Sequence, residues 1–129
     1  MVRFLDNPTE ASKGINVLIV DDDENIARTF SRILSRKGYQ TETALTGAEA
    51  IKKSAAKPFN VALIDICLPD INGMELLHKL GNHDGKMIKI VITGFPTMAK
   101  NGATPDAYLL KPVKPQELHS LIDQKTSRM

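Results

Sequence analysis

The sequence holds a single cysteine and no tryptophan among its 129 residues. One thiol excludes an internal disulfide, and Cys67 with three scattered histidines offers too few ligands for a Cys/His metal site. Long apolar runs are also missing, since none approaches the roughly 20 residues that cross a membrane. The first residues lack the basic-then-apolar pattern of a signal peptide. We therefore expect a cytoplasmic chain without a membrane segment.

An excess of charge of one sign is absent as well. The sequence has 17 basic and 15 acidic side chains, hence a net charge of +2. This balance does not indicate a nucleic-acid-binding surface, so no direct binding of nucleic acid is expected. With 42% hydrophobic and 25% charged residues, the composition is that of an ordinary globular domain. We expect an N-terminal arm or linker over 1–13, one domain over 14–126 and a short tail over 127–129.

Apolar segments and helical patterns alternate along the chain, with glycine, proline and asparagine between them. Strands are predicted at 15–20, 39–43, 61–65, 87–92 and 107–110. Helices are predicted at 24–37, 46–56, 72–80 and 115–125, the second with Thr46 as its cap and Glu49 completing a capping box. Such alternation is typical of parallel strands joined by right-handed crossovers. The predicted fold is α/β, a flavodoxin-like doubly wound five-stranded parallel sheet.

The segment between the fourth and fifth predicted strands departs from this pattern. Residues 94–105 contain two glycines and two prolines, which disfavour a helix. We expect the fourth helix to be short, irregular or mobile. The expected strand order is 2-1-3-4-5, which makes the first and third strands neighbours. In sheets of this kind ligands bind at the carboxyl ends of the strands.

Chemically distinctive residues stand at those carboxyl ends. Asp21 and Asp22 follow the first predicted strand, Asp65 ends the third, Thr93 follows the fourth and Lys111 follows the fifth. Carboxylates that converge repel one another unless a cation enters, and oxygen ligands of this kind suit Mg²⁺. One carboxylate beside such an ion can attack a phosphoryl group, while ammonium and hydroxyl groups bind its oxygens. The set predicts a magnesium-dependent aspartyl phosphate site, although any one member could be a strand cap or a surface charge.

Four motifs resemble, in family order, the receiver domain of two-component response regulators, of the chemotaxis-regulator type. They are Val-Leu-Ile-Val-Asp-Asp-Asp, Leu-Ile-Asp-Ile-Cys-Leu-Pro-Asp-Ile-Asn-Gly-Met-Glu-Leu-Leu, Ile-Thr-Gly and Tyr-Leu-Leu-Lys-Pro. The resemblance covers about residues 15–125. It implies that Asp65 is the phosphoacceptor, that Asp22 binds Mg²⁺ directly and that Asp21 reaches the ion through water. It also implies that Cys67 gives a backbone carbonyl to the metal.

The same resemblance implies a switch and its partners. Thr93 and Lys111 match the hydroxyl and the lysine that hold the phosphoryl group, and Tyr108 matches the aromatic residue that turns inward when the threonine moves. The bond between Lys111 and Pro112 is expected to be cis. The implied donor is a sensor histidine kinase or a histidine phosphotransfer domain, the downstream target is unknown, and a phosphorylation-dependent dimer is an open alternative. The chain would not be an enzyme, but it would assist its own phosphorylation and dephosphorylation.

Two other functions fit part of the pattern. A pseudo-receiver would bind a partner without phosphorylation, but the complete set of acids, Thr93 and Lys111 argues against it. A phosphatase of the haloacid dehalogenase type also uses an aspartyl nucleophile. That class needs a second acid two residues later, where Cys67 stands, and a cap domain for which no residues remain. The phosphorylatable receiver is therefore the principal hypothesis, with the pseudo-receiver as its alternative.

Overall fold

The computed structural model describes residues 14–81, 85–94 and 104–127. Five parallel strands in these ranges form one sheet in the order β2-β1-β3-β4-β5. They are β1 (Asn16–Val20), β2 (Gln40–Ala44), β3 (Val61–Asp65), β4 (Ile88–Thr93) and β5 (Ala107–Leu110). The predicted fold class and strand order are confirmed, and each strand boundary lies within one residue of its predicted place.

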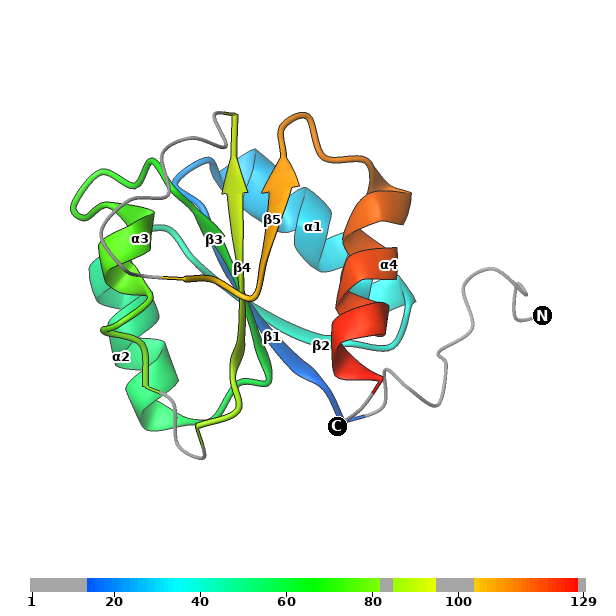
Figure 1. The fold of residues 1–129 in the computed structure, drawn as a ribbon, viewed down its shortest axis with the longest axis horizontal. Helices are drawn as coiled ribbons and strands as arrows, with labels where there is room; N and C mark the ends of the chain where they lie inside the picture. The colour runs from blue at the N-terminus through cyan, green and yellow to red at the C-terminus, as the bar shows by residue number, and fades with distance from the viewer. Residues whose placement is uncertain (1–13, 82–84, 95–103, 128–129) are drawn as a thin grey trace.

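Helices cover both faces of the sheet (Figure 1). They are α1 (Glu24–Arg36) and α4 (Pro115–Thr126) on one face, and α2 (Gly47–Ala56) and α3 (Gly73–Leu76) on the other. An apolar layer fills the space on each side: Ile19, Leu34 and Leu118 belong to the first, Leu18 and Leu76 to the second. Leu18 and Ile19 enter different layers because successive side chains of a strand point to opposite faces.

Local capping explains where the first two helices begin. Asp23 accepts a hydrogen bond from the Asn25 N–H at 2.9 Å ahead of α1. Thr46 Oγ1 accepts one from the Glu49 N–H at 3.1 Å ahead of α2, as the capping-box pattern predicts. The Glu49 carboxylate reaches back to the Leu45 N–H at 2.7 Å rather than to that of the cap residue. Both helices therefore start at fixed points shortly after a strand.

The predicted helix over 72–80 is wrong in length, because α3 ends at Leu76. The carbonyl of Leu77 accepts a hydrogen bond from Lys89 Nζ at 2.6 Å. The Gly81 N–H donates to Ser54 Oγ on α2 at 2.8 Å. These bonds to distant parts of the chain hold the backbone after Leu76 in turns instead of a longer helix.

Two predictions fall largely on residues outside the described ranges: the N-terminal arm, and the short or irregular helix between β4 and β5. Within those ranges, no helix is both long and apolar enough to cross a membrane. All five strands run in the same direction, so their carboxyl ends lie along one edge of the sheet. That edge holds the candidate site.

Candidate functional site

Three carboxylates meet where β1 and β3 end. Asp21 and Asp22 follow β1, and Asp65 is the last residue of β3. The two strands are neighbours, with Val20 paired with Ile64. One carboxylate oxygen from each aspartate takes part in a group whose atoms all lie within 4.8 Å of one another. The structure thus brings together the three acids that the sequence assigns to one site.

The Asp21 carboxylate is buried, and only one of its oxygens has a protein partner in the described ranges. Its Oδ1 accepts a hydrogen bond from the Asp23 N–H at 2.9 Å. Its Oδ2 is buried without a hydrogen-bond partner among the described residues. Burial raises the pKa of Asp21 to about 6, and the charge of Asp65 adds to this rise against the hydrogen bond from Asp23. A divalent cation would supply the missing partner and offset the repulsion, so this donor set fits Mg²⁺.

Asp65 is contacted from two sides. Lys111 Nζ lies 3.2 Å from each of its carboxylate oxygens, and the Cys67 N–H donates to Oδ1 at 3.1 Å. Asp65 is 4% exposed, whereas the side chain of Lys111 is 41% exposed. The ammonium group therefore reaches from the surface to a buried carboxylate and balances one of the three acidic charges.

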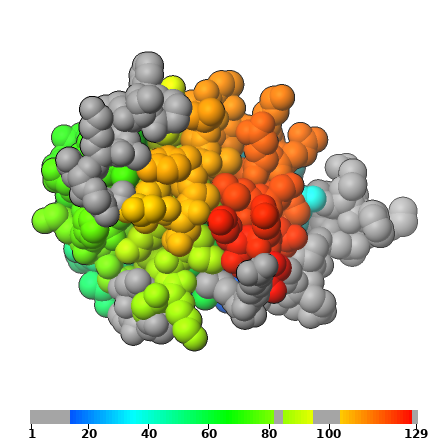
Figure 2. Space-filling view, viewed as in Figure 1, coloured from blue at the N-terminus to red at the C-terminus, as the bar shows by residue number. Residues whose placement is uncertain are grey.

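Thr93 and Lys111 belong to neighbouring strand ends. Thr93 is the buried last residue of β4, and its carbonyl accepts a hydrogen bond from the Lys111 N–H at 3.0 Å. The bond between Lys111 and Pro112 is cis, as expected from the resemblance. Tyr108 lies on the edge strand β5 and is 37% exposed. Figure 2 shows the segment of β5 next to that of α4 on one face of the molecule.

The loop after Asp65 folds back, so that its last residues bond to the residues that directly follow β3. Cys67, whose side chain is exposed, pairs with Asn72 in an isolated antiparallel bridge. The Gly73 N–H then donates to the Ile66 carbonyl at 2.9 Å. A Cβ atom on Gly73 would lie 2.6 Å from the Asp65 carbonyl oxygen, so this close approach of two backbones requires glycine.

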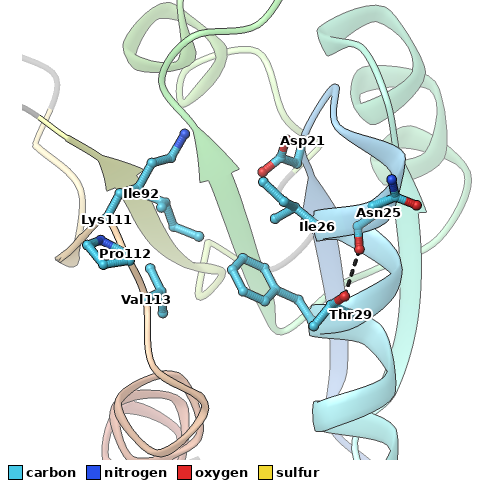
Figure 3. Close-up of a pocket in the computed structure, with 9 residues that line it drawn as sticks. Asp21, Asn25, Ile26, Thr29, Ile92, Lys111, Pro112 and Val113 are labelled. Atoms are coloured by element: carbon cyan, nitrogen blue, oxygen red, sulfur yellow. Dashed lines mark hydrogen bonds between the residues drawn. The ribbon is translucent and has the colours of Figure 1, made fainter.

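A groove with a volume of about 540 Å³ extends from the acidic cluster along α1 (Figure 3). Its lining residues are Asp21, Asn25, Ile26, Thr29, Phe30, Ile92, Lys111, Pro112 and Val113. Asp21 and Lys111 stand at one end, and apolar side chains line most of the rest. The groove leaves no distinct mark in the sequence, because an apolar residue on a helix face gives the same pattern whether it packs inside or lines a groove.

The family described as the response regulator receiver domain matches residues 17–123 of this chain. Among curated relatives, the response regulator ArlR of Staphylococcus epidermidis is 29% identical over 106 residues, which are 80% of this chain and 48% of that protein. The ArlR of Staphylococcus aureus is 29% identical over 105 residues, or 79% of this chain and 48% of that protein. The chain thus spans about half the length of the curated relatives that it matches.

Solved structures show the same likeness. A receiver domain protein described as CheY-like, from Methanospirillum hungatei, has a TM-score of 0.82 and 39% identity, covering 88% of this chain and 94% of that one. The response regulator TrrA of Thermotoga maritima, solved in complex with Mg²⁺ and BeF, has a TM-score of 0.77 and 26% identity. That match covers 86% of this chain and 98% of TrrA.

Proposed function

The chain belongs to the family of response regulator receiver domains of two-component systems, and from this premise we propose that Asp65 accepts a phosphoryl group in a Mg²⁺-dependent reaction. Receiver domains in general bind Mg²⁺ in an acidic pocket and take phosphoryl groups from histidine kinases. For this chain the proposed donor is a sensor histidine kinase or a histidine phosphotransfer domain, and the proposed location is the cytoplasm.

One observation supports the proposal above all others: three carboxylates and one ammonium group converge at a single strand edge. The three carboxylates supply oxygen atoms within 4.8 Å of one another, and Lys111 Nζ lies 3.2 Å from Asp65. A surface cluster without function would not be expected to contain a buried oxygen such as Asp21 Oδ2, which has no hydrogen-bond partner in the part of the chain that the structure describes. A bound cation would interact with this oxygen and so remove the free-energy cost of burying it without a partner.

The residues of the site can share the work of phosphoryl transfer. Asp22 would hold Mg²⁺ directly, Asp21 through water, and Cys67 through its backbone carbonyl. When bound, the ion neutralises charge on the transferred group. A carboxylate oxygen of Asp65 attacks phosphorus, so that an oxygen–phosphorus bond forms while the bond from phosphorus to the donor breaks. Lys111 and the Thr93 hydroxyl then bind oxygens of the new phosphoryl group.

The output would follow from a conformational change around Thr93. If its hydroxyl moves toward the phosphoryl group, space opens for the Tyr108 ring, which is now partly exposed. We therefore propose a signalling switch instead of an enzyme, one that assists its own phosphorylation and dephosphorylation. Its downstream target is unknown, and a phosphorylation-dependent dimer is an open alternative.

Intact mass spectrometry tests the central step. The chain is incubated with acetyl phosphate and Mg²⁺, and the expected result is an increase by one phosphoryl group that is absent in Asp65→Asn and absent in EDTA. Asp106→Asn serves as the matched control and should be labelled like the wild type, since Asp106 lies at the opposite end of β5. No label on the wild type would favour the pseudo-receiver, and full labelling of Asp65→Asn would exclude Asp65 as the acceptor.

A further inference from the structure

The loop that follows the acceptor strand is attached to α2 by the carboxylate of Asp70. Its Oδ1 accepts a hydrogen bond from the Gly47 N–H and its Oδ2 accepts one from the Ala48 N–H, both at 2.9 Å. The partners are 23 and 22 residues apart in the sequence. These two amide groups lower the pKa of Asp70, so the carboxylate stays ionised and the bonds are charge-assisted.

Asp70 caps the first turn of α2 from a distant segment, in addition to the cap that the residues beside the helix provide. Thr46 Oγ1 already accepts the Glu49 N–H at 3.1 Å, and the Glu49 carboxylate accepts the Leu45 N–H at 2.7 Å. These local bonds satisfy the Glu49 and Leu45 N–H groups and leave those of Gly47 and Ala48 to Asp70. Asp70 joins two segments that are distant in the sequence. Its two bonds therefore restrain the position of the loop as well as that of the helix.

Side-chain packing reinforces the attachment. A Cβ atom on Gly47 would collide with Cγ2 of Ile71, the residue after Asp70. The tip of the loop therefore lies directly against the first residue of α2, without space for a larger side chain. Further along, the Gly81 N–H donates to Ser54 Oγ at 2.8 Å, which joins the end of the same segment to α2.

The base of the loop is fixed on the other side. Cys67 pairs with Asn72 in an antiparallel bridge, and the Gly73 N–H donates to the Ile66 carbonyl at 2.9 Å. Cys67 itself donates its N–H to Asp65 Oδ1. The backbone of Cys67 thus lies between two anchors, one at the acceptor strand and one at α2.

We propose that Asp70 is a positioning residue for the reaction at Asp65: by tying the loop tip to α2, it holds the Cys67 backbone where its carbonyl can bind Mg²⁺. This inference rests on the proposed function, since it concerns the metal of that reaction. A loop without the second anchor would have to be ordered when the ion binds, and that ordering weakens binding. Residues that orient metal ligands from outside commonly affect metal affinity in this way.

The test compares Asp70→Ala with Thr46→Ala by calorimetric titration with Mg²⁺ alone. Asp70→Ala removes both bonds to α2, and we expect its Mg²⁺ dissociation constant to rise about tenfold. Thr46→Ala removes the local cap of the same helix without touching the loop, and its dissociation constant should stay within about twofold of the wild type. Asp70→Asn, which keeps one acceptor oxygen, should lie between them and replaces Asp70→Ala if that variant does not fold.

Two results would overturn the inference: unchanged Mg²⁺ affinity in the Asp70 variants, or an equal loss in Thr46→Ala, which would show that only the stability of α2 matters. Failure of the proposed function looks different. In that case the wild type itself would bind no Mg²⁺ and take no label at Asp65. Asp22→Asn provides the reference for a lost direct ligand, and its Mg²⁺ affinity should fall below that of every Asp70 variant.

Discussion

The ammonium group of Lys111 lies at the same distance, 3.2 Å, from both carboxylate oxygens of Asp65, which is 46 residues earlier in the chain. The other charged neighbours of Asp65 in the cluster are the acids Asp21 and Asp22. Without a metal, Lys111 is the cation that forms an ion pair with the acceptor among the described residues. With a metal, the same ammonium is a positive charge close to a second one. Lys111 should thus oppose the binding of Mg²⁺ while assisting the transfer of the phosphoryl group.

Replacing Lys111 by methionine separates these two effects. Removal of the ammonium charge beside a divalent ion changes the electrostatic energy by about 1–2 kcal/mol in a well-hydrated site, so Mg²⁺ should bind about 5- to 30-fold more tightly. Labelling by acetyl phosphate should slow about a hundredfold, because a group that binds the phosphoryl oxygens is lost. Calorimetry and intact mass measure the two quantities. Lys114→Met is the matched control on the exposed surface, and weaker Mg²⁺ binding by Lys111→Met would contradict the electrostatic argument.

The raised pKa of Asp21 gives a signed prediction for stability against pH. Its value in the folded chain is about 6, above the ordinary 3.8, so the folded state holds this proton more tightly than the unfolded state does. The contribution of protonated Asp21 to the free energy of unfolding is fully present below pH 4 and is lost as the pH rises to about 6. Asp21→Asn should avoid this loss and gain, relative to the wild type, up to about 3 kcal/mol of unfolding free energy between these pH values. Urea titrations in EDTA measure the difference, and a gain that is the same at pH 4 and pH 7 would contradict the assignment.

Two glycines near the site should respond differently to an added methyl group. A Cβ on Gly73 would lie 2.6 Å from the Asp65 carbonyl oxygen, whereas a Cβ on Gly94 meets nothing within 4 Å. Gly73→Ala should therefore lower the free energy of unfolding by about 1–3 kcal/mol, because the acceptor backbone has to move. Gly94→Ala should change it by less than about 0.5 kcal/mol. Urea unfolding of both variants checks the contrast, which would be refuted by equal losses.

The sheet and the acidic cluster could be predicted from the sequence because both depend on local signals and on topology. Short β-branched runs mark the strands, and parallel strands bring their carboxyl ends to one edge. Asp21, Asp65 and Lys111 therefore converge once the strand order is assumed. No contact had to be known in advance.

The error in the length of α3 and the omission of Asp70 have a common cause, which is a bond to a distant residue. The helix after Asn72 stops early because Lys89 and Ser54 bind the segment beyond it. Asp70 follows Pro69 in a loop, and its position in the sequence is typical of an ordinary turn residue. Its hydrogen-bond partner Gly47 is 23 residues earlier in the chain. Helical periodicity and turn propensity contain no information on such pairs.

The last prediction concerns the switch, and the two tyrosines of the sequence make it measurable. Tyr39 is buried, and burial together with Asp123 raises its pKa to about 12, so it serves as an internal reference. Tyr108 is 37% exposed on β5. With both tyrosines replaced by fluorotyrosine, ¹⁹F NMR should show two signals, and Tyr39→Phe assigns them.

Addition of Mg²⁺ and beryllofluoride imitates the phosphoryl group on Asp65. We expect the Tyr108 signal to shift and to lose its sensitivity to solvent, because the ring enters space that Thr93 leaves, while the Tyr39 signal stays in place. The bound fluoride gives its own ¹⁹F signals, which report occupancy of the site. An unchanged Tyr108 signal at full occupancy would show that the ring does not move inward, and any output would then have to pass through another part of the chain.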